Sequence, residues 1–465
     1  MTRLIEQNEP RAKELQMPER SAPALARLQI RWYHRDALDV QSASSADGSK
    51  AVLMRLSFLA LFLAILSLAA YAQPTFRVLH AFGSGEEGAG LWGSVTLDAQ
   101  GNVYGVTLGG GPNGYGTLFQ LSAQDGQWTL TTLHSFPSSA GDGVAPWGGP
   151  VLDAAGNIYG TTTGGGIYGF YDGTVYAAAP GPDGWNEIVI HSFGGPGDDA
   201  CGNFTGLTID ENGNLYGGCY AAFELSPSGN GWDETMLHTF AGQNGDGFGA
   251  KEAPILDARG NLYGATWYGG GELACPANKG CGTIYQLRPG SPSWEEHVIH
   301  RFGSFASDGK VPGLGPLAID AQGNLYGVTS QGGANLCVDV GCGTIFKLTP
   351  VAASTGIVWI ETILYNFVDG SSGNGPGGNV IIDGAGNLYG TTGYGGSRQC
   401  GCGVVYELSP NNGGWKYTVL HTFVGPDGDF PDANLTLGRD GNLYGTTADG
   451  GAYYGGVVFQ IQIAQ

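Results

Sequence analysis

The sequence predicts an all-β fold, a seven-bladed β-propeller with four strands in each blade. Three observations predict it. The phrase G-N-[LIV]-Y-G occurs seven times, a second phrase of the form W-x5-H-x-F recurs between its copies, and the two ends of the chain each carry an incomplete repeat. Such self-similarity is the sign of a repeat architecture. The 84 glycines among 465 residues have no Gly-X-Y period, and 42% of residues are hydrophobic, so collagen and a disordered chain are excluded.

The G-N-[LIV]-Y-G phrase predicts a hairpin between the first two strands of each blade. Asp suits the first position of a type I turn, and Gly suits the left-handed position that closes a three-residue hairpin loop. Residues 316–320 and 324–329 are examples of the two strands that such a turn joins. Six of the seven copies have an aspartate three residues before the phrase, and the seventh has Gly438 there. The six turn-forming aspartates are Asp98, Asp153, Asp210, Asp257, Asp320 and Asp383.

Two further strands complete each predicted blade. A Gly-rich loop leads to the third strand, as at residues 282–287, and the W-x5-H-x-F phrase forms the fourth. Trp, His and Phe stand at even offsets, so they are expected on one face of that strand, packed against a neighbouring blade. Histidines spaced around a rim cannot converge on one substrate, and we interpret them as structural. They are His80, His134, His191, His238, His300 and His421.

The ends of the chain predict how the ring closes. Residues 76–82 read as a fourth strand without the first three, and residues 456–461 read as a third strand without a fourth. The N-terminal strand is therefore expected to complete the last blade, which leaves no large open sheet edge. We name the strands A to D outward from the axis. The predicted propeller spans residues 73–465.

The repeat resembles a known tandem repeat. The run G-N-L-Y-G-T-T, then G-G, then G-T-[VI]-[FY]-x-L, then W-x4-L-H-x-F is similar to the GloVer repeat of exported "choice-of-anchor" bacterial proteins, over essentially all of residues 76–461. This resemblance implies a secreted or surface bacterial repeat protein. The D-x-x-G-N-[LIV]-Y hairpin alone is also similar to NHL-type and streptogramin-lyase-like propellers.

The residues before the repeats have the anatomy of an export signal. Met54-Arg55 precedes an apolar run that ends in Ala70-Tyr71-Ala72, which is typical of a signal peptide over residues 54–72. A single membrane anchor is the alternative. Because a signal peptide belongs at the N-terminus, residues 1–53 are interpreted as a start-site overcall. The sequence thus predicts a secreted or cell-surface protein with no membrane span after cleavage.

The chain is strongly acidic. It holds 20 Lys and Arg against 41 Asp and Glu, a net charge of −21, and residues 1–72 contribute 9 of the basic and 7 of the acidic residues, so the remainder carries −23. Such a surface repels phosphate backbones, and nucleic-acid binding is not expected. The expected state is a monomer.

All eight cysteines follow the predicted signal peptide, and their even number behind it indicates disulfides. Two close pairs are expected to staple loops, whereas the spacing of the last pair makes that bond less certain. A metal site is the alternative, although no histidine lies nearby in the sequence. The residues are Cys201, Cys219, Cys275, Cys281, Cys337, Cys342, Cys400 and Cys402.

One face of the propeller is the candidate ligand site. Because strands alternate in direction, the long D–A and B–C loops share a face, and variable loops on a rigid scaffold commonly carry function. Aromatic side chains there could stack on sugar rings, or else plug the channel. Asp-Gly loops could bind Ca²⁺, or else only form turns. The residues are Trp92, Trp147, Trp267, Tyr268, Tyr394, Tyr453, Tyr454, Asp142, Asp246, Asp308 and Asp427.

Three functions remain open from the sequence. The favoured hypothesis is a binding module whose ligand is a glycan or a cell-surface partner. The second is a propeller enzyme of the lyase or lactone-hydrolase type, with a metal-assisted site at the channel mouth. The third is a purely structural surface protein. No nucleophile motif, Walker A motif or zinc-ligand spacing is present in the sequence, so catalytic residues are not assigned.

Overall fold

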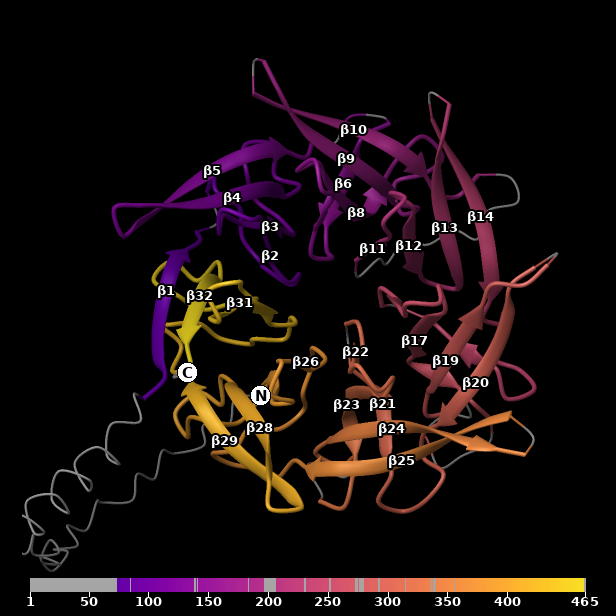
Figure 1. The fold of residues 1–465 in the computed structure, drawn as a ribbon. Helices are drawn as coiled ribbons and strands as arrows, with labels where there is room; N and C mark the ends of the chain where they lie inside the picture. The colour runs from indigo at the N-terminus through magenta and orange to yellow at the C-terminus, as the bar shows by residue number, and fades with distance from the viewer. Residues whose placement is uncertain are drawn as a thin grey trace, which may run out of the picture. The chain divides into compact units, whose positions relative to one another are not determined.

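The computed structural model describes residues 73–463 except 84, 138, 140, 183, 196–205, 230, 251, 272–274, 276–279, 292, 314, 336, 338–339 and 355. The predicted signal peptide and Cys201 lie outside these residues. Within them the chain is all-β, and its sheets form a ring of seven blades (Figure 1). No helix in this described part is long and apolar enough to cross a membrane. The seven-bladed propeller predicted from the repeats is confirmed.

The innermost strand A has two residues in every blade. These strands are β2 (Thr96–Leu97), β7 (Val151–Leu152), β11 (Thr208–Ile209), β16 (Ile255–Leu256), β22 (Ala318–Ile319), β26 (Ile381–Ile382) and β30 (Thr436–Leu437). Strand B follows as β3 (Val103–Thr107), β8 (Ile158–Gly165), β12 (Leu215–Gly218), β17 (Leu262–Thr266), β23 (Leu325–Gly332), β27 (Leu388–Thr392) and β31 (Leu443–Thr447).

The outer strands C and D are longer. Strand C is β4 (Thr117–Gln124), β9 (Thr174–Gly181), β13 (Ala221–Ser228), β19 (Thr283–Arg288), β24 (Thr344–Ala353), β28 (Val404–Asn411) and β32 (Val457–Gln462). Strand D is β5 (Gln127–Ser135), β10 (Gly184–Ser192), β14 (Gly231–Thr239), β20 (Glu295–Arg301), β25 (Gly356–Asn366), β29 (Gly414–Thr422) and β1 (Thr75–Ala81). Short loop strands also occur, namely β6 (Gly143–Pro146), β15 (Gly247–Phe248), β18 (Tyr268–Gly269) and β21 (Gly309–Pro312).

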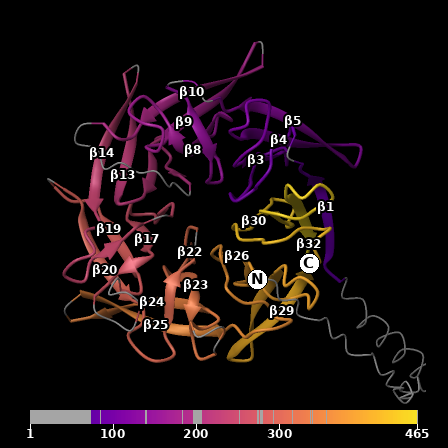
Figure 2. The same ribbon diagram turned by 180° about the vertical axis from the view of Figure 1, so that it is seen from behind.

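The N-terminal strand closes the ring. The last blade has the strand order β1-β32-β31-β30, and β1 pairs antiparallel with β32 from Thr75 opposite Gln462 to Ala81 opposite Val457. Figures 1 and 2 show this first strand beside the last one, seen from the two faces of the ring. The closure expected from the incomplete repeats at the two ends is therefore the one observed.

The A–B turn is built around its aspartate. In the fifth blade, Asp320 Oδ1 accepts hydrogen bonds from the Gln322 and Asn324 amides at 2.9 Å, and Oδ2 accepts from Asn324 Nδ2 at 2.7 Å and from the Tyr326 hydroxyl at 3.0 Å. Gly323 has φ +78°, as the predicted hairpin loop requires. Burial disfavours the charge on Asp320, but these hydrogen bonds outweigh burial and hold the pKa of its carboxyl below the ordinary value.

The seventh blade keeps this turn without its aspartate. Gly438 occupies the first position, and Asp440, two residues later, takes over the role of acceptor. Its Oδ2 accepts from Asn442 Nδ2 at 2.6 Å and from the Tyr444 hydroxyl at 2.8 Å. The hydrogen-bonded triad of aspartate, asparagine and tyrosine is thus retained in a blade where the sequence motif is broken.

Replacing Asp320 by alanine is expected to destabilise the fold by about 2 kcal/mol, because two backbone amides and two side-chain donors lose their acceptor. Chemical denaturation monitored by circular dichroism measures the effect. Gln322→Ala, at an exposed position of the same turn, is the control. Equal free energies of unfolding for the two variants would contradict the assigned role of Asp320.

Aromatic pairs hold neighbouring blades together. The phenylalanine of each W-x5-H-x-F phrase is buried and meets the aromatic ring of strand C in the next blade, at centroid distances from 4.7 to 5.4 Å. Each strand C ring covers the second glycine of G-N-[LIV]-Y-G. At Gly327, for example, a Cβ atom would lie 2.6 Å from Phe346 Cζ, so a larger residue does not fit.

The expectation that Trp, His and Phe share one face of strand D is wrong. A β-bulge shifts the register just before the histidine, as between Val189 and His191 in β10. The extra residue reverses the alternation. Trp185 therefore faces the preceding blade, where its ring meets Tyr104, whereas Phe193 faces the following one, where its ring meets Phe223.

Candidate functional site

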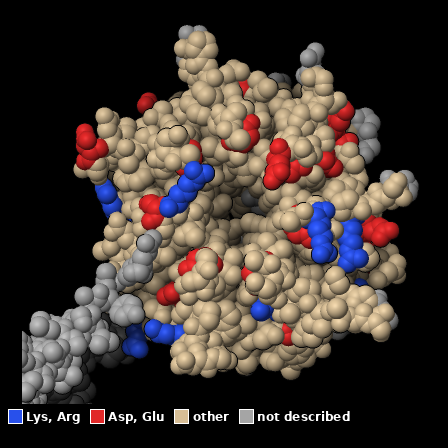
Figure 3. Space-filling model, viewed as in Figure 1, with Lys and Arg blue, Asp and Glu red and all other residues tan. Residues whose placement is uncertain are grey.

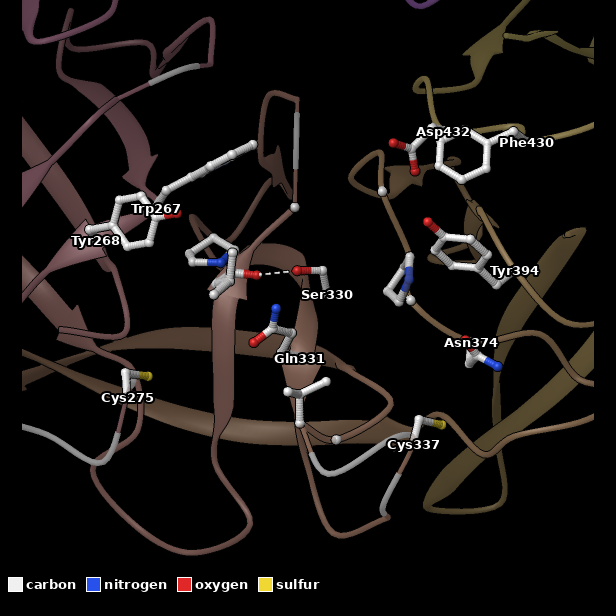
Figure 4. A pocket seen from close by; sticks show the side chains of 18 of the residues that line it. Trp267, Tyr268, Cys275, Ser330, Gln331, Cys337, Asn374, Tyr394, Phe430 and Asp432 are labelled. Carbon is white, nitrogen blue, oxygen red and sulfur yellow. Dashed lines mark hydrogen bonds between the residues drawn. The ribbon is translucent and has the colours of Figure 1, made fainter. Parts of the chain in front are cut away.

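The D–A and B–C loops of the fourth to seventh blades enclose a pocket of about 880 Å³ near the centre of the ring. Figure 4 shows its labelled side chains, with Trp267 and Tyr268 on one wall and Tyr394, Phe430 and Asp432 on the opposite wall. The space-filling view shows a hollow at the centre of the ring that is bordered mainly by residues without charge (Figure 3). No lysine or arginine is among the lining residues that the structure describes.

The first wall is fixed by a two-stranded ribbon. Trp267 directly follows β17, and Tyr268 begins β18, which pairs with β15 through Phe248 opposite Tyr268. The Trp267 amide also donates to the Gly249 carbonyl at 3.1 Å. The Trp267 and Tyr268 rings stand edge to face at 6.4 Å. Two half-buried aromatic rings therefore reach the pocket from a backbone that is held at both ends.

The opposite wall combines an exposed ring with a ring that is carried by a strained backbone. Tyr394 is 55% exposed, and its ring meets that of Phe430 edge to face at 5.1 Å. Phe430 has φ +60°, a left-handed conformation that costs about 1–2 kcal/mol for a residue with a side chain. Hydrogen bonds from the Phe430 amide to the Cys402 carbonyl and from the Ala448 amide to the Phe430 carbonyl hold it there. This conformation places the Phe430 ring against the pocket.

Asp432 supplies the carboxylate of the pocket. It comes two residues after Phe430 and lies against Gly377, where a Cβ atom would overlap the carboxylate. Burial raises the pKa of Asp432 to about 6. The polar lining continues with Ser330, whose hydroxyl donates to the Val311 carbonyl at 3.1 Å, and with Gln331 and Asn374.

A second, narrower pocket of about 210 Å³ lies along the channel and shares Asp432 with the first. Its lining includes Trp92 and Trp147, whose rings stack at 5.3 Å with an angle of 21° between their planes. Trp92 also meets Phe430 edge to face at 5.6 Å. The two indole rings of this pair therefore pack against each other.

Two disulfides shape the larger pocket. Cys275–Cys281 and Cys337–Cys342 close short loops in the fourth and fifth blades, and Cys275 and Cys337 are part of the pocket lining. Cys400–Cys402, the pairing that the sequence leaves uncertain, is also formed. Cys219 is disulfide-bonded as well, while Cys201 lies outside the described residues. The predicted loop staples are thus present beside the site.

The candidate residues from the sequence divide into separate locations. Trp267, Tyr268 and Tyr394 line the larger pocket, whereas Trp92 and Trp147 line the channel. The other two aromatics lie in an exposed loop of the seventh blade and line neither pocket; they are Tyr453 (68% exposed) and Tyr454 (85% exposed).

The four aspartates proposed from the sequence do not line either pocket. They lie near the rim and accept hydrogen bonds from loop amides. Asp246 Oδ2 accepts from the Ala241 amide at 2.7 Å, and Asp308 Oδ2 accepts from the Ser304 amide at 2.8 Å. Asp142 and Asp427 accept likewise from the amides of Gly143 and Val424. In these contacts each carboxylate bonds to its own loop, and a role of the four aspartates in ligand binding stays a prediction from the sequence.

The sequence does not predict four of the pocket residues, namely Phe430, Asp432, Gln331 and Asn374. Phe430 and Asp432 belong to the segment that precedes strand A. Counted back from the first residue of the A–B turn, Asp432 stands at the same position as Trp92 and Trp147 in their blades. Aligning the D–A loops on the A–B turn could therefore have predicted Asp432, because the aligned position contributes one residue per blade near the axis.

The profile of the Gloeobacter/Verrucomicrobia repeat matches residues 65–271 and 338–465, which is more than half of the chain. The chain has no significant match among curated proteins.

Solved structures give three examples of similar chains. A "putative oxidoreductase (glucose dehydrogenase)" from Thermus thermophilus has 12% identity and a TM-score of 0.38, covering 83% of this chain and 100% of its own. A protein of unknown function from Dyadobacter fermentans has 11% identity and a TM-score of 0.42, with coverages of 84% and 100%. A "putative 6-phosphogluconolactonase" from Bacteroides uniformis has 12% identity and a TM-score of 0.43, with coverages of 70% and 83%.

Proposed function

This chain belongs to the Gloeobacter/Verrucomicrobia repeat family, and we propose that it is an exported binding module whose aromatic pocket takes a neutral glycan. The observation that carries the proposal is the pair of facing walls. Trp267 and Tyr268 stand opposite Tyr394 and Phe430 across a pocket of about 880 Å³. Disulfides beside the pocket favour an oxidising compartment outside the cytoplasm.

The chemistry of the walls fits a sugar. A pyranose ring presents apolar C–H faces to aromatic rings and hydroxyl groups at its edges, and binding sites of this kind combine apolar walls with a few placed polar groups. Gln331 and Asn374 offer amide donors and acceptors, and Asp432 offers a carboxyl group. The acidic surface and the lack of Lys or Arg in the described lining disfavour anionic ligands.

The same lining does not favour the enzyme hypothesis. Among the described lining residues of the larger pocket, Asp432 is the single carboxylate, and no histidine is present. A lyase or lactone hydrolase needs a base, and usually a metal, beside the reacting bond. The described histidines lie on or near strand D, away from the axis. A binding role asks only for the rings and polar groups that line the pocket.

An array of neutral and acidic oligosaccharides, followed by calorimetric titration of any glycan that binds, tests the proposal. We expect a neutral oligosaccharide to bind and Trp267→Ala or Tyr394→Ala to weaken its affinity by about tenfold or more, since each removes a stacking surface. Tyr454→Ala removes the same ring as Tyr394→Ala, but from an exposed position outside the pocket lining, and should leave the affinity unchanged. The proposal is wrong if no neutral glycan binds, or if all three variants bind like the wild type. Selective binding of a surface protein instead would support the other ligand class.

A further inference from the structure

Titratable residues gather where adjacent outer strands meet, far from the pocket just described. The histidine of strand D in one blade approaches an aspartate eight residues later and a glutamate of strand D in the next blade, two residues after its tryptophan. The structure describes three such clusters, at the joints between blades 1 and 2, 3 and 4, and 4 and 5. They are His134/Asp142/Glu187, His238/Asp246/Glu296 and His300/Asp308/Glu361.

Each cluster brings one imidazole nitrogen and two carboxylate oxygens within 4.8 Å of one another. At the joint between blades 4 and 5, His300 Nε2 lies 3.8 Å from Asp308 Oδ1 and 3.6 Å from Glu361 Oε1. These separations are too long for hydrogen bonds. They match the edge of a coordination polyhedron, because ligands bonded at about 2.1 Å in tetrahedral geometry lie about 3.4 Å apart.

The polar atoms of this cluster are buried without hydrogen-bond partners in the described part of the chain. The side chain of Asp308 is 0% exposed and that of Glu361 is 7% exposed. Among the described residues, no donor or acceptor reaches Asp308 Oδ1, His300 Nε2 or either carboxylate oxygen of Glu361, whereas Asp308 Oδ2 accepts from Ser304. His134 Nε2 and Glu187 Oε1 are in the same state at the first joint. Buried polar atoms of native proteins are normally paired, so these atoms require an explanation.

Joints that lack the glutamate provide an internal comparison. His80 there approaches Glu87 Oε2 at 3.0 Å, and His421 approaches Asp427 Oδ2 at 2.9 Å, both ordinary hydrogen-bond distances. The position of the glutamate is taken by Phe76, which stacks on His421 at 3.6 Å, and in the sixth blade by Tyr417, which stacks on Tyr365 at 4.3 Å. At the three described joints with three potential ligands, the histidine nitrogen lies 3.4–3.8 Å from a carboxylate oxygen, and of these contacts only that of His238 with Asp246, at 3.4 Å, is a hydrogen bond.

We propose that each described His–Asp–Glu cluster binds one divalent transition-metal ion, Zn²⁺ in the first instance, which clips two neighbouring blades together. Imidazole and carboxylate ligands suit Zn²⁺, with a water molecule completing the shell. The charge balance favours the same occupant, because two buried carboxylates and one M²⁺ ion are together neutral. The half-buried imidazoles, 13–26% exposed, leave a path for the ion to enter. A proton shared by the two carboxylates is the competing way to neutralise each cluster.

Elemental analysis of the full chain, purified without a histidine tag, incubated with ZnCl₂ and desalted, tests the proposal. We expect about three equivalents of zinc per chain, one for each described cluster. Glu361→Gln, which keeps the side-chain shape, should lower the content by about one equivalent. Glu87→Gln, at a joint without the cluster, should not change it. Chelation by EDTA should lower the melting temperature of the wild type by about 5 °C or more, and by less in Glu187→Gln/Glu296→Gln/Glu361→Gln.

Circular dichroism of each variant shows whether it is folded, so a loss of metal is separable from a loss of structure. The proposal is overturned if the wild type retains less than about 0.2 equivalents of zinc after reconstitution and retains no manganese in its place. The shared proton would then be what neutralises each cluster. A zinc content that Glu361→Gln leaves unchanged would equally overturn the assigned ligands. Neither outcome bears on glycan binding, because the clusters and the pocket share no residue.

Discussion

Deletion of residues 75–82 is expected to abolish the folded ring, and the single substitution Phe82→Ala is expected to cost about 3–5 kcal/mol of stability. The strand β1 supplies the outer edge of the last blade through its pairing with β32. Phe82 is 0% exposed, and its ring lies 4.9 Å from that of Phe119 in the first blade. It is therefore an aromatic contact that joins the last blade to the first.

Chemical denaturation of the full chain and of its Phe82→Ala variant measures this cost, and solubility together with circular dichroism reports on the deletion. Phe305→Ala is the matched control, because Phe305 is 49% exposed and should change stability by less than about 0.5 kcal/mol. If Phe82→Ala were as stable as the control, the contact between the first and last blades would not be what closes the ring.

Replacement of Glu252 by glutamine is expected to stabilise the protein increasingly as the pH rises above about 5. Glu252 is 1% exposed, and its Oε2 accepts from Asn379 Nδ2 at 3.4 Å, while Oε1 has no hydrogen-bond partner among the residues that the structure describes. Asn379 is itself held, since its Oδ1 accepts from the Val328 amide at 2.8 Å and its Nδ2 donates to the Gly315 carbonyl. Burial outweighs the amide hydrogen bond from Gly315 and raises the pKa of Glu252 well above its ordinary value.

The sign follows from proton linkage. The folded state keeps a proton on Glu252 that the unfolded chain releases above a pH of about 4.5. The contribution of Glu252 to the free energy of unfolding is therefore smallest at high pH. Between the unfolded and the folded pKa, wild-type stability should fall by about 1.4 kcal/mol per pH unit through this group. Glu252→Gln keeps the amide contact and removes the slope. Parallel pH curves of wild type and variant would contradict the assignment, and the exposed Glu86→Gln should give such parallel curves.

The architecture could be predicted because each strand is marked by residues whose physical role is local. Position 323 requires a glycine because its backbone is left-handed, and position 320 requires an aspartate because several donors surround its carboxylate. Both requirements recur in each blade, and even the exception at Gly438 is repaired by Asp440 within the same turn. The order of the strands then follows from the two incomplete repeats.

The orientation of the outer strand could not be predicted, because a β-bulge carries no sequence signal in the W-x5-H-x-F phrase. Strict alternation places His300 and Trp294 on one face, whereas the register shift after Ile284 turns His300 toward the next blade. This shift is what brings His300 to Glu361 of the neighbouring blade. Because this one-residue shift in register was not predicted, the sequence did not predict that these residues form a cluster.

The pocket was predictable only in part, because it depends on the conformation of loops. Trp267 and Tyr394 line the pocket, but nothing in the sequence separates them from Tyr454, which points into solvent. Phe430 lines the pocket because of a strained backbone angle, and Asp432 reaches it because Gly377 leaves room. Convergence of this kind comes from tertiary contacts between separate blades.

We propose that the facing aromatic walls form one ligand site, and a crystal structure of the protein with the neutral oligosaccharide that binds most tightly on the array tests this proposal. We expect a sugar ring stacked on Trp267 or Tyr394, with its hydroxyl groups bonded to Gln331, Asn374 or Asp432. A sugar bound on the outer rim, or on the exposed loop of Tyr453 and Tyr454, with the pocket free of ligand, would contradict it.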